Sequence, residues 1–305
     1  MLQLSHQNLL RIFTENAKKN PYLFSILRPA GNNTGLVGAL VRNPQQRKFI
    51  ADILRNKYPN IEQVGFINFD PHNAELIMSG GEFCGNATSS AAHLILHGKQ
   101  GKLTIKVSGV KEKLIAGVTE SGEGFSQMPV FSDASSIKTD NHGNALVAME
   151  GITHYVDFDA DKIKGLTIEE VKEKARKQMT EMRIDQELAC GIIYVKKIKD
   201  QLSIHPIVYV RDADTLYYET ACGSGTTALG LVLAKKEGRD IKELPIIQPS
   251  GLTIKVTVSF NGKTFTYAQI QSSIQKIYEG KLTPQLLSAS ERKNQHQELI
   301  PRFSH

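Results

Sequence analysis

Twice in this sequence of 305 residues, a cysteine stands directly in front of a run of small residues. The first stretch is Cys84-Gly85-Asn86-Ala87-Thr88-Ser89-Ser90-Ala91, and the second is Cys222-Gly223-Ser224-Gly225-Thr226-Thr227-Ala228-Leu229. Each follows a short apolar run that is typical of a β-strand, and each is followed by a glycine that can end a helix, Gly98 or Gly238. The pattern predicts two helices that each begin at a cysteine.

A cysteine at a helix start has a defined electrostatic setting. The helix N-terminus carries about half a positive charge and several unpaired N–H groups, which favour a thiolate and can also hold a carboxylate. A free cysteine has a pKa of ~8.5, and a helix end contributes up to ~2 kcal/mol, or about 1.5 pKa units. We therefore expect one thiolate to be accessible near neutral pH. Two such thiols facing each other should share one proton, which suits removal of a proton from one face of a substrate and its return on the other.

Each stretch also has an ordinary structural explanation. Cysteines are mostly buried small hydrophobic residues, and glycine with serine or threonine at a helix start is common capping. Packing alone does not require Cys-Gly at both helix starts, so the repetition favours a functional interpretation. The third cysteine, Cys190, lies at the start of a predicted strand with no helix behind it, and we expect it to be structural.

The composition limits the classes of function. Hydrophobic residues make up 40% and charged residues 22%, as in an ordinary globular protein. The net charge of +6 comes from scattered residues that do not interleave with aromatic ones, so we expect no nucleic-acid partner. Three cysteines do not make a disulfide framework, which favours a reducing cytoplasm. No signal peptide is apparent and no stretch approaches the ~20 apolar residues of a membrane span, so we expect no membrane partner.

The predicted elements occur in the same order twice, with the two cysteines 138 residues apart (84 to 222). Strong helix starts at Asn43-Pro44 and at Thr167 add to this repeat. We predict an α+β fold of two pseudo-symmetric domains, each a mixed β-sheet wrapped around a central helix, with the active cleft between them. The predicted parts are a helical extension over 1–22, a first domain over 23–130 joined by 270–285, a second domain over 131–269, and a polar tail over 286–305.

These residues resemble the diaminopimelate epimerase superfamily of cofactor-independent racemases. The resemblance covers roughly residues 24–280 and rests on Gly31-Asn32, Glu62-Gln63 and the two Cys-Gly elements. Within the superfamily the sequence most resembles the histidine racemase of the staphylopine metallophore pathway. That similarity lies in 29–32, 62–67, 78–80 and 82–88.

The sequence departs from diaminopimelate epimerase where that enzyme binds the distal amino-carboxylate end of its substrate. The Gly-Asn-Pro-His element of the family corresponds here to Gly151-Ile152-Thr153-His154, and the Thr-Asn element falls at Ala189-Cys190-Gly191. The adjacent Glu-Arg pair is not matched by Arg211-Asp212-Ala213-Asp214. A distal carboxylate without those donors would lose ~1–3 kcal/mol for each missing partner, which argues against diaminopimelate as substrate.

The resemblance implies a two-base reaction, in which one cysteine as thiolate takes the α-proton and the other as thiol delivers one to the opposite face. The expected catalytic residues are Cys84, Cys222 and Glu62, the last for proton transfer or for holding the substrate ammonium. Backbone N–H groups at the helix starts would bind the substrate carboxylate and its enediolate-like transition state. The expected substrate-binding residues are Asn32, Gly85, Asn86, Gly223, Ser224, Gly225, Glu219 and His154.

Taken alone, several of these residues have a structural alternative: Glu62 as a surface carboxylate, Asn32 or Asn86 as a turn or cap residue, and His154 as a hydrogen-bonded core histidine. We predict no cofactor and no metal, because no Cys/His cluster has ligand spacing and no glycine-rich nucleotide loop follows a strand. Nothing in the sequence requires pyridoxal phosphate.

The predicted function is that of a cytoplasmic, cofactor-independent amino-acid racemase similar to histidine racemase. Its predicted partner is a free amino acid, and a homodimer is left open. Alternative enzymes of the same fold are diaminopimelate epimerase, proline or hydroxyproline epimerase and a phenazine-type isomerase. An alternative of another class is a non-catalytic amino-acid-binding protein, although binding would need the helix ends and not two thiols.

Overall fold

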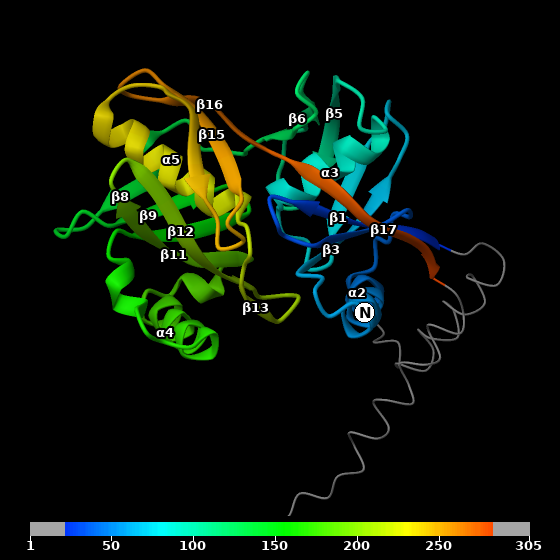
Figure 1. Ribbon diagram of the computed structural model, residues 1–305, viewed down its shortest axis with the longest axis horizontal. Helices are drawn as coiled ribbons and strands as arrows, with labels where there is room; N and C mark the ends of the chain where they lie inside the picture. The colour runs from blue at the N-terminus through cyan, green and yellow to red at the C-terminus, as the bar shows by residue number, and fades with distance from the viewer. Residues whose placement is uncertain (1–21, 283–305) are drawn as a thin grey trace, which may run out of the picture.

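A computed structural model describes residues 22–282 of the chain. The helix predicted near the N-terminus and the polar tail predicted at the C-terminus lie outside these residues. Figure 1 shows two halves side by side, one built around α3 (Gly85–Ile95) and the other around α5 (Gly223–Glu237). The two predicted helices that begin after Cys84 and Cys222 are therefore present, and each lies at the centre of one half.

Mixed sheets surround both helices. The first half contains β1 (Tyr22–Pro29), β2 (Thr34–Val37), α2 (Pro44–Lys57), β3 (Gln63–Asn68), β4 (Glu75–Met78), β5 (Gly101–Val107), β6 (Leu114–Val118) and β7 (Gly124–Gln127). The second half contains β8 (Ile137–Thr139), β9 (Ala145–Met149), β10 (Ile152–Asp157), α4 (Ile168–Glu181), β11 (Ala189–Ile198), β12 (Gln201–Val210), β13 (Thr215–Tyr218), β14 (Ile241–Ile247), β15 (Thr253–Phe260) and β16 (Phe265–Ser272). A last strand, β17 (Ile274–Leu282), returns to the first half and pairs antiparallel with β1.

The pairing of the strands follows one pattern in both halves. In the first, β2 and β3 are parallel with α2 between them, β3 and β4 are antiparallel, and β4 is parallel to β5 after α3. In the second, β10 and β11 are parallel with α4 between them, β11 and β12 are antiparallel, and β12 is parallel to β14 after α5. Antiparallel pairing of β7 with β16 connects the halves. The fold is thus mixed α+β, and its order of pairings occurs twice.

Local sequence signals explain where the outer helices begin. Asn43 accepts a hydrogen bond from the Gln46 N–H at 3.0 Å, and Pro44 occupies the first helical position of α2. Thr167 and Glu170 form a reciprocal capping box at the start of α4. Both predicted helix starts are confirmed.

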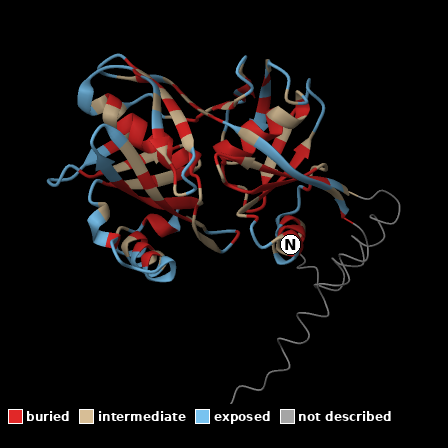
Figure 2. Cartoon of the chain, in the orientation of Figure 1, coloured by how far each residue is buried: buried red, intermediate tan, exposed pale blue. Residues whose placement is uncertain are grey.

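The main hydrophobic core surrounds both central helices. Small residues fill α3, and eight consecutive positions from Gly85 to Ala92 are buried, so strands can approach it closely on several sides. The helix α5 is also apolar or small around most of its circumference, which is typical of a helix enclosed by a sheet. Figure 2 shows buried segments concentrated along these two helices, with exposed segments on the outer loops and on α4. Separate smaller cores lie beneath α2 and α4.

Two strands at the C-terminal end were not predicted from the sequence. In β16, buried and partly exposed residues alternate as expected for a half-buried strand. In β17, most side chains are exposed, so the hydrophobic alternation that identifies a strand is weak. Its place beside β1 depends on long-range pairing that the local sequence does not show.

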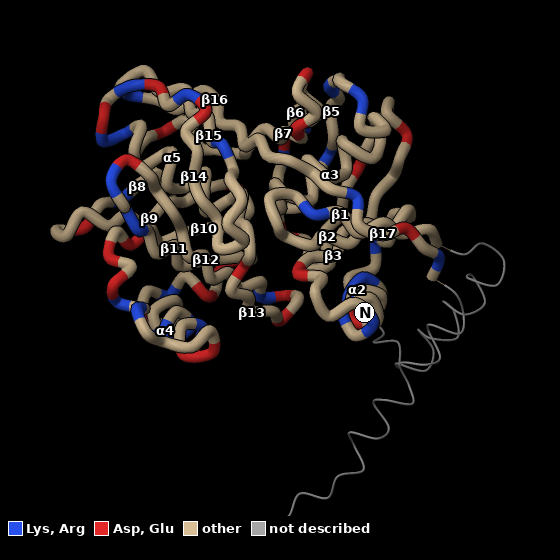
Figure 3. The backbone as a smooth tube through the Cα atoms, in the orientation of Figure 1, with Lys and Arg blue, Asp and Glu red and all other residues tan. Residues whose placement is uncertain are grey.

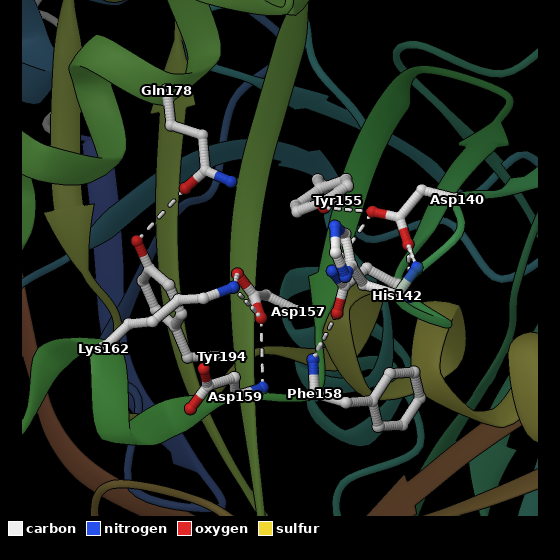
Figure 4. Close-up of polar contacts among 10 residues, drawn as sticks. Asp140, His142, Tyr155, Asp157, Phe158, Asp159, Lys162, Gln178 and Tyr194 are labelled. Carbon is white, nitrogen blue, oxygen red and sulfur yellow. Dashed lines mark hydrogen bonds and ion pairs between the residues drawn. The ribbon is translucent and has the colours of Figure 1, made fainter.

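Polar side chains of the second half form a network of hydrogen bonds and an ion pair (Figure 4). Asp157 is 1% exposed and pairs with the Lys162 ammonium at 2.7 Å, while the Tyr155 hydroxyl donates to Asp140 at 2.8 Å. The Tyr194 hydroxyl donates to the Gln178 side chain at 3.2 Å, which connects β11 to α4. Each buried polar group in this network has a protein partner, so we assign it a structural role.

Charged residues of both signs are distributed over the outer loops and helices of both halves (Figure 3). Across residues 22–282, no helix has the length and apolarity needed to cross a membrane. The same residues contain no cluster of three or more His, Cys, Asp or Glu side chains arranged to hold a metal ion.

Candidate active site

The N-termini of α3 and α5 converge at the boundary between the halves. The Asn86 side-chain amide donates to the Ala221 carbonyl at 2.9 Å, directly before the second cysteine. A Cβ atom at Gly223 would lie 2.5 Å from Ile270 Cδ1 and 3.1 Å from Asn86 Oδ1. A larger residue here would have to displace the end of the Ile270 side chain and crowd Asn86, so glycine favours the close approach of the two helix starts.

Cys84 is the N-cap residue of α3. Its backbone is extended, with φ −141° and ψ 110°, and its sulfur accepts the Ala87 N–H at 3.3 Å. The thiol donates to the Gln63 side-chain carbonyl at 2.8 Å. Cys84 is 8% exposed, so its sulfur lies at the end of the helix and at the edge of the buried interior.

Cys222 has the same geometry at the start of α5. Its φ and ψ are −126° and 106°, and its sulfur accepts the Gly225 N–H at 3.3 Å. The Ser224 hydroxyl lies 3.5 Å from this sulfur, and the same hydroxyl is 2.8 Å from Nε2 of His154. Both sulfurs therefore accept a first-turn N–H of their own helix, as the sequence predicts for cysteines at helix starts.

Both cysteines line one cavity between the halves. The cavity is narrow, with about 30 Å³ of room for the centres of water-sized molecules, roughly enough for one or two waters. The wall comes from α2, the start of β3 with the residue before it, and the strands β10, β11, β12 and β13. The first turns of α3 and α5, with the residues just before them, complete it. The lining residues are Arg55, Glu62, Gln63, Glu82, Phe83, Cys84, Gly85, Asn86, Ile152, Ala189, Val208, Val210, Thr215, Tyr217, Glu219, Cys222, Gly223 and Ser224.

Three carboxyl groups of the wall, those of Glu62, Glu82 and Glu219, have pKa values that burial raises. Burial raises the pKa of Glu62 to about 7, although hydrogen bonds from Thr220 and Asn32 oppose this effect. Burial, and then the nearby charge of Glu62, raise the pKa of Glu219 to about 8. Glu219 is 4% exposed and accepts the Gln63 side-chain N–H at 2.7 Å. The cavity thus holds two carboxyl groups that change protonation near neutral pH.

The expectation that the helix ends would lower the thiol pKa values is wrong for this narrow form of the cavity. Burial raises the pKa of Cys84 and of Cys222 well above the ordinary value, and the carboxyl group of Glu219 adds to the increase at both. Hydrogen bonds from the helix N–H groups act in the opposite direction but are outweighed. Desolvation therefore exceeds the helix effect, and both cysteines are neutral thiols here.

Three predicted binding residues lie behind the wall. Asn32 is fully buried, donates to Glu62 at 2.8 Å and accepts from Thr34 at 3.0 Å, so both its polar atoms already have protein partners. His154 contacts Ser224, and Gly225 contacts the Cys222 sulfur through its N–H. Among the described residues that line the cavity, none of these three is present. Each of the three instead contacts a residue that lines the cavity: Asn32 contacts Glu62, His154 contacts Ser224, and Gly225 contacts Cys222.

The functional interpretation of the sequence missed several polar residues of the wall: Arg55, Gln63, Glu82, Thr215 and Tyr217. Gln63 contacts both Cys84 and Glu219. Glu82 is 7% exposed, and its Oε2 atom has no hydrogen-bond partner among residues 22–282. Gln63 and Glu82 both belong to motifs that carry the family resemblance, Glu62-Gln63 and 82–88. Gln63 directly follows Glu62, and Glu82 stands two residues before Cys84. These positions were the signal in the sequence that could have predicted a place in the site.

Cys190 lies apart from this cavity. It is fully buried in the core beneath α4 and is absent from the described residues that line the site. Burial raises the pKa of its thiol to about 12. No helix start lies behind it, since it belongs to β11.

Comparison with known proteins places this geometry in a family. The family model described as the histidine racemase CntK N-terminal domain matches residues 23–283. The chain belongs to the histidine racemase family. It is an isomerase, of the class of amino-acid racemases and epimerases.

Relatives in the family cover most of the chain. A histidine racemase of Fusobacterium nucleatum subsp. nucleatum strain ATCC 23726 is 32% identical over 239 residues, which are 75% of this chain and 86% of that protein. A histidine racemase of Staphylococcus aureus strain Mu50 is 28% identical over 242 residues, 75% of this chain and 85% of that protein.

Several solved structures share the fold at low sequence identity. A hydroxyproline epimerase from Agrobacterium vitis has a TM-score of 0.56 and 13% identity, covering 87% of this chain and 93% of that one. A probable proline racemase from Agrobacterium radiobacter K84 has a TM-score of 0.58 and 13% identity, covering 86% and 93%. A phenazine biosynthesis protein of the PhzF type from Enterococcus faecalis has a TM-score of 0.54 and 14% identity, covering 86% and 99%.

Proposed function

We propose that this protein racemises histidine by a cofactor-independent, two-base mechanism that uses Cys84 and Cys222. The observation that carries the proposal is that two N-cap cysteines from two helices line one cavity, together with three carboxyl groups of raised pKa. A binding protein would need the helix ends, but it would not need a sulfur on each. Membership in the histidine racemase family supports the choice of substrate.

In the proposed reaction, the thiolate of one cysteine takes the α-proton, so that the C–H bond breaks and an S–H bond forms. The electron pair moves into the substrate carboxylate, which becomes an enediolate. First-turn N–H groups at Gly85, Gly223 and Ser224 have no partner within their helices, and they are the donors that would stabilise the enediolate charge. The other cysteine then gives its S–H proton to the opposite face of the α-carbon. One proton leaves and one arrives, so the reaction needs no co-reactant.

The substrate ammonium has acceptors on the same wall. Asn86 Oδ1 is buried and has no hydrogen-bond partner in the described chain, while its amide nitrogen is held by Ala221. Asn86 therefore offers an acceptor, which matches an ammonium and not a carboxylate. Glu62 and Glu219 lie on the same cavity wall. A bound ammonium would favour the ionised form of each carboxyl group, because an opposite charge nearby lowers the pKa of an acid.

For the side chain, Glu82 offers a matching group. Glu82 lines the cavity, and its buried Oε2 atom has no hydrogen-bond partner among the described residues. An unpaired buried acceptor is costly unless a ligand supplies a donor. The imidazole of histidine carries one N–H donor in its neutral form. We assign Glu82 as the acceptor of that N–H. Because the observed cavity is narrow, its walls must separate for an amino acid to enter.

The repeated order of strand pairings supports a finer description of the fold. The halves around α3 and α5 would be two pseudo-symmetric domains, with the last strand returning to the first. The reaction itself is symmetric, since each cysteine serves one enantiomer. A pair of related domains provides two related helix ends for that purpose.

The test is chiral chromatography of single amino acids after incubation with the purified protein, without added cofactor. We expect L-histidine and D-histidine each to approach an equal mixture, and the double variant Cys84→Ser/Cys222→Ser to leave both unchanged. Faster conversion of meso-diaminopimelate or trans-4-OH-L-proline than of histidine would overturn the proposed substrate. Tight binding of histidine without conversion would overturn the proposed reaction.

A further inference from the structure

The side chain of Gln63 lies between the two proposed catalytic centres. It stands at the first position of β3, in the half that holds α3. Its carbonyl oxygen accepts the Cys84 S–H at 2.8 Å, and its amide nitrogen donates to Glu219 Oε1 at 2.7 Å. Glu219 follows β13 in the other half, so this one amide bridges the boundary between the halves.

The bridge continues to the second cysteine. Glu219 and Cys222 line the same cavity, and the Glu219 carboxyl group raises the pKa of the Cys222 thiol. Four side chains therefore stand in one series, Cys84, Gln63, Glu219 and Cys222, in which hydrogen bonds join the first three. Two of its members are the proposed acid and base, and the other two connect them.

The two-base reaction requires these four side chains to adopt two protonation states. Before one enantiomer reacts, Cys222 is the thiolate and Cys84 is the thiol; after the reaction these roles are exchanged. If the hydrogen-bond donors were fixed in place, they could match only one of these two protonation states. The other state would then contain an unpaired thiolate or two acceptors facing each other, which is costly in a buried site.

An amide can serve both forms, because it carries a donor and an acceptor at nearly equal positions. With Cys222 ionised, protonated Glu219 donates to that sulfur, the Gln63 N–H donates to Glu219, and the Cys84 S–H donates to the Gln63 carbonyl. With Cys84 ionised, the amide is rotated by 180°, so its N–H donates to the Cys84 sulfur and its carbonyl accepts from protonated Glu219. The Cys222 S–H then donates to the other Glu219 oxygen. Every donor has an acceptor in both forms.

We propose that Gln63 is a positioning residue whose amide rotation matches the hydrogen bonds to whichever of Cys84 and Cys222 is ionised. This inference rests on the proposed two-base function. No proton passes through the amide: the substrate gives its α-proton to one sulfur and takes a proton from the other. The Glu219 proton only moves from one carboxyl oxygen to the other as the amide turns.

The test compares Gln63→Leu and Gln63→Met, which remove the donor and the acceptor, with Gln63→Glu, which keeps an acceptor and loses the donor when ionised. The matched control is Gln271→Leu. Gln271 also donates from a strand to a glutamate, at 2.6 Å to Glu123, but it lies outside the cavity lining of the described chain. Rates of alkylation by iodoacetamide are measured for each cysteine separately, by peptide mass spectrometry across pH 6 to 10 without substrate. Steady-state kinetics are then measured with each enantiomer of histidine.

We expect the three Gln63 variants to slow alkylation of Cys84 about tenfold at a given pH, because its thiolate loses a charge-assisted donor, and to change Cys222 by less. We expect kcat to fall about 10- to 100-fold with KM changed less than about threefold, and Gln271→Leu to match the wild type. Parallel changes at both cysteines, or unchanged alkylation of Cys84 with normal kcat, would overturn the proposal. A wild type that does not racemise histidine would refute the proposed function, whereas the alkylation rates report on the network independently. If the leucine variant does not fold, the methionine and glutamate variants give the same comparison.

Discussion

The surroundings of Cys84 and Cys222 share a local geometry and differ in their long-range contacts. Each sulfur accepts the N–H of the residue three positions later in the sequence at 3.3 Å. The backbone carbonyl of each cysteine accepts the hydroxyl of a threonine four positions later at 2.7 Å. Beyond this first turn the environments diverge. Cys84 donates to Gln63, whereas Cys222 lies against Ser224 and Glu219.

The difference extends to the residues just before each cysteine. Glu82 stands two residues before Cys84; it lines the cavity, and one of its side-chain oxygens is buried without a partner among the described residues. Thr220 stands two residues before Cys222 and donates to Glu62 through both its backbone N–H and its hydroxyl. The local sequence thus gives both sulfurs the same first-turn geometry. Tertiary contacts leave an unpaired carboxyl oxygen on the Cys84 side, whereas on the Cys222 side Thr220 binds the carboxyl group of Glu62.

The largest expected effect is loss of either sulfur. Cys84→Ser and Cys222→Ser should each reduce racemisation by about 10³-fold or more, because a serine hydroxyl is too weak an acid to provide the base. Cys190→Ser should keep most activity, since that thiol lies in the core beneath α4. The measurement is the rate of optical change from each enantiomer of histidine. A large loss in Cys190→Ser with a normal melting temperature would contradict the assignment of the pair.

The next effect concerns stability and distinguishes the acid beside Cys222. Burial raises the folded-state pKa of Glu219 to about 8 from its ordinary value of 4.5. The native state therefore holds this proton more tightly than the unfolded state does, and the associated stability is complete below about pH 4.5 and is lost as pH rises through 8. Glu219→Gln should remove this loss and gain on the order of 2–4 kcal/mol relative to the wild type between pH 4.5 and 8. Urea unfolding at a series of pH values measures it, and parallel curves for both proteins would contradict the account.

A smaller effect tests the acid on the Cys84 side. Glu82→Leu should lower kcat/KM for histidine by about 10- to 100-fold, because the imidazole N–H loses its acceptor. The same variant should turn over 3-(2-thienyl)alanine, whose ring has no N–H, as fast as the wild type does. Glu82→Gln keeps an acceptor oxygen and should lose less. Equal losses for both substrates in Glu82→Leu would show that Glu82 does not read the side chain.

The smallest expected effect is at Ser224. Its hydroxyl connects the Cys222 sulfur to His154, whose pKa burial lowers to about 3, so the ring is neutral over the assay range. Ser224→Ala should reduce kcat by less than about tenfold and destabilise the fold by ~1–3 kcal/mol, because His154 Nε2 loses its partner. The pH profile of kcat should keep its shape. A new limb near pH 6.5 would show that His154 titrates and would revise its role.

Much of the site could be predicted because its geometry is local. A cysteine followed by glycine and small residues, after a short apolar run, specifies an N-cap, and the structure has both caps. The helix starts at Asn43 and Thr167 could also be predicted, because their capping residues lie within one turn of each helix start.

The remaining features depend on contacts between distant residues. The raised thiol pKa values follow from burial between the halves, and no local pattern reports how narrow that space is. The contact of Gln63 with Glu219 joins residues 156 positions apart. Asn32 resembles a substrate-binding asparagine in sequence, but Thr34 and Glu62 occupy its polar atoms in the fold. Strand β17 was missed because its exposed residues do not alternate with buried ones.

The most direct test of the two-thiol account is deuterium incorporation at the α-carbon of histidine in D2O, followed separately from each enantiomer. In the wild type, the product enantiomer should carry deuterium from its first appearance. In Cys84→Ser and in Cys222→Ser, interconversion should stop, and any exchange that remains should be confined to opposite enantiomers in the two variants. If both single variants still interconverted the enantiomers at near wild-type rates, the two cysteines would not be the two bases.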